Sequence, residues 1–307
     1  MRHHPLGCRA LPAARARRSF TLVEMLIVIL IITILASIVL VGMTSVLEKG
    51  KRERTQAQIA RLNALLTDRW ESYLTRRVPV ANQSTLAATA LLRLSGVREL
   101  MRLELPDRKT DVVEGPVVPG IMQPSLSVAY NAMATAGWSV THQGAECLYM
   151  IVSQIQDGPS TGLQFFRQNE IGDVDGDGMP EILDAWGNPI ELLRWAPGFR
   201  SPLQDGVAAN GADAFDPLQV DPRFDDGDAT NDPFLLHPLI FSAGTDGLYE
   251  IATDTSPTAL SYASISPAND PYHVPGSGSQ LGAPVDTNSD SIDNSRDNIH
   301  NHLIEAN

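Results

Sequence analysis

The chain has 307 residues and a formal net charge of −13 at pH 7, and 43% of its residues are hydrophobic. This length is enough for one large folded domain with a core of its own, or for two small ones. Residues 1–110 carry 18 Lys or Arg and 8 Asp or Glu, whereas residues 111–307 carry 5 and 28. An acidic second half repels a phosphate backbone, so we expect no nucleic-acid partner, and cations or solvent alone are the expected neighbours of that surface.

The first predicted element is an apolar helix. Met25 to Met43 is a run of 19 residues without a charge, dominated by Leu, Ile and Val. A helix of that length reaches roughly the thickness of the hydrocarbon core of a bilayer. A buried helix of a soluble protein would show a polar face, and a secretory signal peptide would have a shorter apolar run before a small-residue cleavage site. We therefore predict a single membrane-spanning helix.

The residues just before this run form a recognisable signal. Basic residues within 1–18 lead into the run from Ser19 to Glu24, which reads Ser-Phe-Thr-Leu-Val-Glu. Here the chain resembles the type IV prepilin signal for cleavage and methylation, in which a prepilin peptidase cuts a short basic leader ahead of the Phe. The resemblance implies a leader at residues 1–19, cut between Ser19 and Phe20, although the family usually has Gly where this chain has Ser19.

Glu24 lies at the edge of the apolar helix, where a carboxylate is costly unless it is paired. In the resembled family this glutamate pairs with the free amino terminus of a neighbouring subunit, here Phe20, as the filament assembles. The alternative is an interfacial glutamate that only reaches toward the headgroup region. The resemblance favours the assembly role for Glu24.

The basic residues around the span do not decide its orientation. Five arginines precede it, and five basic residues between positions 49 and 61 follow it. The resemblance, which is to the type IV pilin and type II secretion pseudopilin class, implies a single-pass protein of the bacterial inner membrane. Its leader would lie in the cytoplasm and its C-terminal domain in the periplasm. The implied partners are other pilin-like subunits in a homo-oligomeric filament, the prepilin peptidase and an inner-membrane assembly platform.

The apolar helix is predicted to continue beyond the membrane. Apolar side chains recur there at steps of three and four on one helical face: Ile59, Leu62, Leu66, Trp70 and Tyr73. We expect the helix to run to about Arg77, because Pro79 cannot continue it. The resemblance implies an α+β, pilin-like fold with loop-rich insertions, in which residues 20–44 are the transmembrane half of the helix. Its outer half, residues 45–78, would pack on a small antiparallel sheet.

Residues 79–255 are predicted to form the globular domain. Residues 80–170 mix apolar helical patches, such as Ala87 to Leu105, with proline-marked loops, and we interpret them as an insertion that enlarges the pilin domain. Ala145 to Gln156 is apolar, but it is too short for periodicity to decide between helix and strand. Two strands are predicted further on, bounded by Pro or Gly: Ile190–Trp195 and Leu239–Phe241.

Residues 256–307 are rich in Ser, Asn, Asp, Pro and Gly, which predicts a loop-rich C-terminal tail. Near its end His300 and His302 flank Asn301. Two histidines at this spacing can ligate a transition metal, but a solvated terminus is the expectation for such a polar segment.

An acidic loop within the globular domain has the spacing of a calcium site. Side chains with oxygen ligands stand at positions 1, 3, 5, 9 and 12 of an EF-hand-like loop, with glycine at position 6: Asp173, Asp175, Asp177, Glu181 and Asp184. Alternate residues of a tight turn point inward, and the glycine permits the bend. Asp184 is shorter than the usual glutamate, and Pro180 stiffens the loop. The pattern therefore leaves two interpretations, a structural calcium site and a solvated acidic turn.

Two further runs, from Asp184 to Ile190 and from Phe241 to Gly247, resemble the major pseudopilin of type II secretion. That family has an Asp-x-Trp-Gly-Asn-Pro turn before one strand and a Ser-x-Gly-x-Asp-Gly loop after another. The later loop takes part in binding structural calcium there, which implies Ser242 and Asp246 as candidate ligands. Turn chemistry alone also explains both runs.

The sequence does not point to an enzyme. It shows no Ser-His-Asp order with a nucleophile elbow, no Cys-His pair in a motif and no phosphate loop. The resemblance predicts a structural subunit of a type II secretion pseudopilus, which drives protein export by filament assembly. The alternatives are a major or minor type IV pilin and, from a different class, a membrane-anchored hydrolase with a calcium-stabilised domain.

Overall fold

The computed structural model describes residues 20–157, 160–253, 271–272, 280–286 and 297–305. The chain divides into two compact units that meet in the sequence between Glu48 and Lys49. The first unit contains the apolar half of the N-terminal helix, and the second contains helices and short antiparallel strands. The long apolar helix together with small antiparallel sheets confirms the predicted α+β, pilin-like class.

Helix α1 runs from Leu22 to Ser72 and ends before the predicted limit at Arg77. At its end the backbone N–H groups of Tyr73 and Leu74 donate to carbonyls three residues back, at 3.2 and 3.0 Å, which tightens the last turn. The Tyr73 hydroxyl then donates to the buried Glu104 at 2.8 Å. The predicted end of the helix was wrong because the helix does not continue to Pro79. It ends at Ser72, where these contacts of Tyr73 and Leu74 begin.

The part of α1 in the second unit buries the predicted apolar face. The five residues of that face are each at most 6% exposed and belong to the main core: Ile59, Leu62, Leu66, Trp70 and Tyr73. Burying side chains of this size stabilises the fold by about 1.5–3 kcal/mol each. Polar contacts flank the face, since Gln58 donates to the carbonyl of Leu183 at 3.2 Å and Thr55 accepts from the N–H of Ala185 at 3.1 Å.

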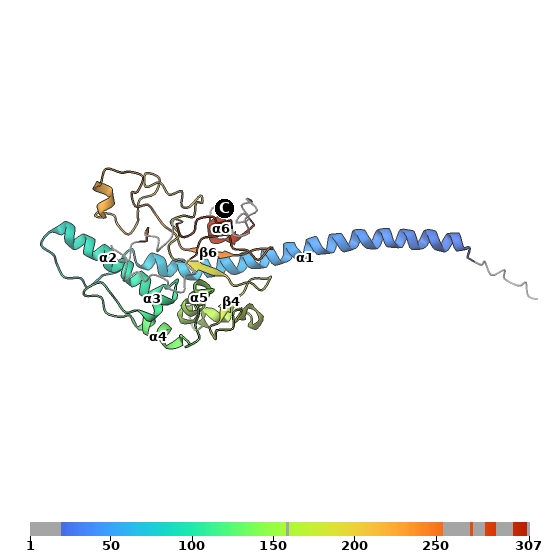
Figure 1. Cartoon of the computed structure of the whole chain (residues 1–307), viewed down its shortest axis with the longest axis horizontal. Helices are drawn as coiled ribbons and strands as arrows, with labels where there is room; N and C mark the ends of the chain where they lie inside the picture. The colour runs from blue at the N-terminus through green and yellow to red at the C-terminus, as the bar shows by residue number, and fades with distance from the viewer. Residues whose placement is uncertain (1–19, 158–159, 254–270, 273–279, 287–296, 306–307) are drawn as a thin grey trace, which may run out of the picture. The chain divides into compact units, whose positions relative to one another are not determined.

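Three helices occupy the first part of residues 80–170, the region predicted as an insertion (Figure 1). They are α2 (Leu86–Glu104), α3 (Lys109–Val113) and α4 (Ser125–Met133), and each contacts the other two. Thr85 caps α2 by accepting from the N–H of Ala88 at 3.1 Å. The apolar patch predicted as helical is therefore α2.

Helix α5 (Gln143–Gln154) settles the question left open for the apolar segment after residue 145. Its buried face packs against two antiparallel hairpins, β1 (Gln156–Asp157) with β2 (Ser160–Thr161), and β3 (Ile171–Gly172) with β4 (Glu181–Ile182). Two short 3-10 helices connect the hairpins: η1 (Gly162–Phe165) and η2 (Gln168–Glu170).

A three-stranded antiparallel sheet, in the order β5-β6-β7, lies beside α5. β5 (Glu191–Leu193) pairs with β6 (Leu239–Ser242), with Leu192 opposite Ile240, which confirms both predicted strands. The long connection between them contains turns and the 3-10 helix η3 (Pro222–Asp225).

The last strand comes from the segment predicted as a loop-rich tail. β7 (Ile299–His300) pairs with β6 and leads into α6 (Asn301–Glu305). The Asn301 side chain accepts from the N–H of Ile240 at 2.9 Å and donates to the carbonyl of Pro238 at 2.9 Å, which fixes the strand to the sheet. His302 is fully buried, so the expectation of a solvated terminus was wrong. Most of the predicted tail lies outside the described residues.

Buried carboxylates near α2 and α3 are paired with arginines. Arg102 donates to Glu99 at 3.0 and 3.1 Å, and Arg194 Nη1 donates to Asp111 at 2.8 Å. These side chains are at most 1% exposed. Pairing of this kind is the usual way in which a fold tolerates buried charge.

Candidate functional site

The side chains of Thr21 and Glu24 cap the N-terminal end of α1. The Thr21 N–H and hydroxyl both donate to Oε2 of Glu24, at 2.8 and 2.9 Å, and the Glu24 N–H donates to the Thr21 hydroxyl at 3.2 Å. This reciprocal arrangement is a capping box, and it starts the helix at Leu22. Phe20 is 76% exposed, and Ser19 lies outside the described residues.

The first unit presents an apolar surface that is exposed among the described residues. The large apolar side chains described between Leu22 and Leu47 are all exposed, and Leu22 itself is 82% exposed. Within the described residues, α1 is the one helix long and apolar enough to cross a membrane, and none of its most apolar 18-residue stretch is buried. Such a surface requires lipid or other apolar helices around it.

The predicted calcium loop joins β3 to β4. Carboxylate oxygens of Asp173, Asp175 and Asp177 lie within 4.8 Å of one another. The N–H groups of Gly176 and Gly178 donate to Asp173 at 2.8 and 3.1 Å, and both glycines have φ in the left-handed region, at 77° and 91°. The loop is therefore tightly folded, but it lies between two strands and not between the two helices of an EF-hand.

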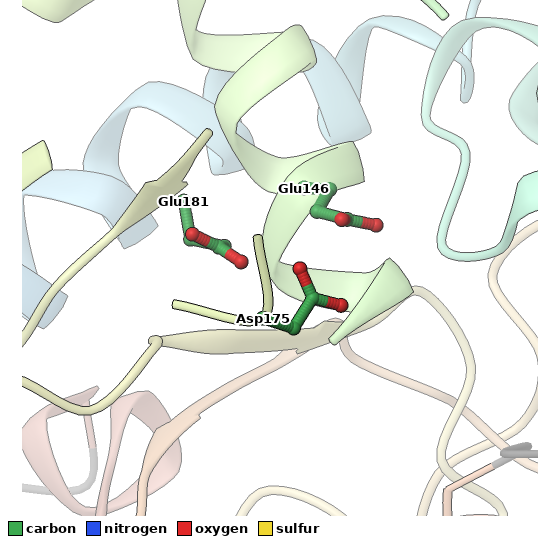
Figure 2. Close-up of side chains that lie close together, drawn as sticks. All are labelled: Glu146, Asp175 and Glu181. Carbon is green, nitrogen blue, oxygen red and sulfur yellow. The ribbon is translucent and has the colours of Figure 1, made fainter. Parts of the chain in front are cut away.

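A second group of carboxylates shares Asp175 with this loop. Carboxylate oxygens of Glu146, Asp175 and Glu181 also lie within 4.8 Å of one another. They come from three segments, α5, the acidic loop and β4, and their carboxylates face a common space (Figure 2). Asp175 is exposed, and its Oδ2 accepts from the Ser139 hydroxyl at 2.9 Å, whereas Glu146 and Glu181 are fully buried.

The two buried glutamates are in surroundings that disfavour their charge. Burial, together with the nearby carboxylates of Asp177 and Asp175, raises the pKa of Glu146 to about 9, against the hydrogen bond from the Trp138 indole. Burial also raises the pKa of Glu181 to about 7, against the N–H of Val174, which donates to Oε2 at 3.1 Å. In both glutamates Oε1 is buried without a hydrogen-bond partner.

Comparison with known proteins concerns the N-terminal segment. Residues 14–40 match the family of the prokaryotic N-terminal methylation motif. In this segment the chain resembles type IV pilin-like proteins and carries a prepilin-type signal. The match covers the end of the basic leader, Phe20, Glu24 and most of the apolar run. No curated protein and no solved structure matches the chain.

The structure of this pilin-like chain gathers some of the predicted calcium ligands and separates others. The four carboxylates between residues 173 and 181 lie in the two groups just described. Asp184 lies elsewhere: its Oδ1 accepts from three N–H groups of residues 186–188 and its Oδ2 from the Ser242 hydroxyl at 2.7 Å. Asp246 caps its own turn by accepting from the N–H two residues on, at 2.9 Å.

Sequence reasoning missed Glu146. It lies in α5, far along the chain from the acidic loop, and a sequence does not show which helix packs beside a loop. A signal was nevertheless present. Glu146 interrupts an otherwise apolar run, and acidic side chains are almost never fully buried unless something compensates them.

Proposed function

We propose that this chain is a structural subunit of a pilus-like filament of the type II secretion pseudopilus class. Filament assembly would drive protein export. The observation that carries the proposal is the prepilin-type signal at residues 14–40, which runs directly into an exposed apolar helix with a single acid, Glu24, in its first turn. The subunit would be anchored in the bacterial inner membrane, with its C-terminal domain in the periplasm, until it joins the filament.

The geometry of the helix start supports a pairing between subunits. Once a prepilin peptidase cuts after Ser19, Phe20 carries a new α-amino group, which is largely protonated at neutral pH. The Thr21 N–H and hydroxyl both donate to Oε2 of Glu24, so Oε1 can accept from the amine of a neighbouring subunit while the capping box is kept. Neutralising this carboxylate in an apolar bundle offsets the cost of its burial.

Processing is the first test. The chain is expressed with and without an active prepilin peptidase, extracted from membranes and measured by intact mass spectrometry. The expected product begins at Phe20 in the presence of the peptidase only. Persistence of the leader in cells with an active peptidase overturns the filament proposal.

Assembly is tested with two matched variants. Glu24→Gln keeps a side chain able to complete the capping box but removes the charge, whereas Thr21→Ala removes the cap and keeps the charge. We expect Glu24→Gln to be processed normally and to reduce filament incorporation about tenfold or more, with little loss for Thr21→Ala. Normal incorporation of Glu24→Gln contradicts the pairing. Equal losses in both variants would assign the defect to the cap.

A type IV pilin is the second candidate, because it uses the same kind of N-terminal segment. The insertion formed by α2, α3 and α4 enlarges the outer domain, as a minor subunit at a filament tip would allow. Deleting the gene separates the two functions. Loss of exported proteins from the medium supports the pseudopilus, and loss of surface pili with normal export supports the pilin.

A further inference from the structure

The strongest feature outside the N-terminal segment is the meeting of carboxylates from three parts of the fold. Glu146 comes from α5, Glu181 from β4, and Asp175 from the loop between β3 and β4. Asp173 and Asp177 extend the group through Asp175. Five acidic side chains therefore gather around one end of α5, and the ligand oxygens within each group lie within 4.8 Å of one another.

Each buried glutamate is anchored through one oxygen and leaves the other unsatisfied. Oε2 of Glu146 accepts from the Trp138 indole, and Oε2 of Glu181 accepts from the N–H of Val174. Oε1 of each is buried and has no hydrogen-bond partner among the residues that the structure describes. A buried oxygen without a partner is costly and rare in folded proteins, so it requires an explanation.

No lysine or arginine of the described residues supplies that explanation. Within the described residues, no lysine or arginine forms an ion pair with any of the five carboxylates. The same fold pairs its other deeply buried acids with arginines, as Glu99 with Arg102 and Asp111 with Arg194 show. The carboxylates of Glu146 and Glu181 therefore lack a positive charge where the chain elsewhere provides one.

We propose that Glu146, Asp175 and Glu181 bind one Ca²⁺ ion, with Asp173 and Asp177 completing the set of carboxylates. All the candidate ligands are oxygens, which excludes the nitrogen and sulfur sites typical of zinc. Ca²⁺ takes six to eight oxygen ligands in flexible geometry, whereas Mg²⁺ requires a near-ideal octahedron and retains water. A loop turned by Gly176 and Gly178 suits the less demanding ion.

This site connects two parts of the domain that are not adjacent in sequence. The loop is already attached to the segment before α5, because the N–H of Ser139 donates to Asp177 at 2.6 Å and the Thr135 hydroxyl donates to the carbonyl of Asp177 at 3.0 Å. An ion shared with Glu146 fastens the loop to α5 itself. Binding to the folded state alone then adds to the stability of the domain.

The test uses the full chain in detergent. CaCl₂ is titrated calorimetrically into chelator-treated protein, and thermal unfolding is followed in CaCl₂ and in EGTA. We expect binding of one ion with a dissociation constant on the order of 0.1 mM or tighter, and a rise of about 5 °C in the unfolding midpoint at saturation. No binding in the millimolar range, or an equal response to MgCl₂, overturns the assignment.

Three variants make the test specific to these residues. Glu146→Gln and Asp175→Asn should each weaken Ca²⁺ binding about tenfold or more, and Asp175 is exposed, so its variant carries little folding risk. In EGTA, Glu146→Gln should unfold no earlier than the unchanged chain, because the amide oxygen can still accept from the Trp138 indole. Asp246→Asn, which lies in its own turn, is the matched control and should bind normally. Normal binding by Glu146→Gln removes α5 from the site. None of these results depends on filament assembly.

Discussion

Ser242 donates its hydroxyl hydrogen to Oδ2 of Asp184 at 2.7 Å, joining the turn before β5 to the end of β6. Asp184 is 5% exposed, and its other oxygen accepts the three N–H groups of the turn at residues 186–188. One carboxylate thus folds the turn and holds it to the neighbouring strand. Both residues were candidate calcium ligands in the sequence, and in the structure they contact each other.

The first prediction concerns this contact. Asp184→Ala leaves the N–H groups of the turn and the Ser242 hydroxyl without their acceptor, so we expect it to lower the free energy of unfolding by about 3 kcal/mol. Asp184→Asn keeps an acceptor for the turn and should cost about 1 kcal/mol, as should Ser242→Ala. Denaturant unfolding of the single and double variants measures the coupling. Strictly additive losses would show that the two side chains do not act together.

A second prediction concerns the close approach of α2 to the segment before it. A Cβ placed on Gly96 would lie 2.5 Å from Cγ1 of Val78, and Gly96 is buried. Gly96→Ala should therefore destabilise the chain by about 2 kcal/mol through overpacking, although alanine is the better helix former by about 1 kcal/mol.

Val78→Ala provides the matched test, because it removes the atom in the way. In the Val78→Ala background, Gly96→Ala should be neutral or stabilising in the same denaturant experiment. A stable Gly96→Ala single variant would mean that the segment around Val78 moves aside at little cost.

The third prediction is a pH dependence at His302. Nε2 of His302 lies 3.1 Å from the carbonyl of Pro238, and Nδ1 lies 2.9 Å from the Ser201 hydroxyl. The carbonyl only accepts, so we assign the ring proton to Nε2, and Nδ1 of the neutral ring accepts from Ser201. Burial, with a smaller contribution from His237 and His300, lowers the pKa of His302 to about 4, against the hydrogen bond to the Pro238 carbonyl.

A lowered histidine pKa means that the unfolded chain takes up the proton first as pH falls. The stability contribution of neutral His302 is thus complete above the unfolded pKa of about 6.5 and is lost as pH falls toward 4, by about 2 kcal/mol at pH 5. His302→Gln should remove this part of the pH dependence. Unfolding curves of the two proteins from pH 7.5 to 5 should converge, and parallel curves would contradict the shift.

The sequence predicted those elements whose apolar residues form a pattern long enough to recognise. The face from Ile59 to Tyr73 repeats over four turns of α1, and β5 and β6 are apolar and bounded by Pro or Gly. The two-residue strand β7 has no readable period, and its neighbours are polar. It is a strand because β6 offers it hydrogen bonds from a distant part of the chain, which is a tertiary effect.

The acidic site was also predictable only in part, because local spacing determines some of its residues and tertiary packing determines the others. Asp173, Asp175 and Asp177 are local, and alternate spacing in a tight turn was enough to predict that they gather. Glu146 joins them only because α5 packs beside β4. Asp184 leaves them because nearby N–H groups compete for its oxygens, and spacing alone does not reveal that competition.

The position of β7, far behind β6 in the sequence, has a consequence for biogenesis. While the polypeptide is still emerging, the edge of β6 that later pairs with β7 has free backbone groups beside buried residues such as Phe241. An open edge of this kind is a template for wrong pairing with another nascent copy. Correct maturation therefore depends on the order of synthesis, because β6 is made before the strand that protects its edge.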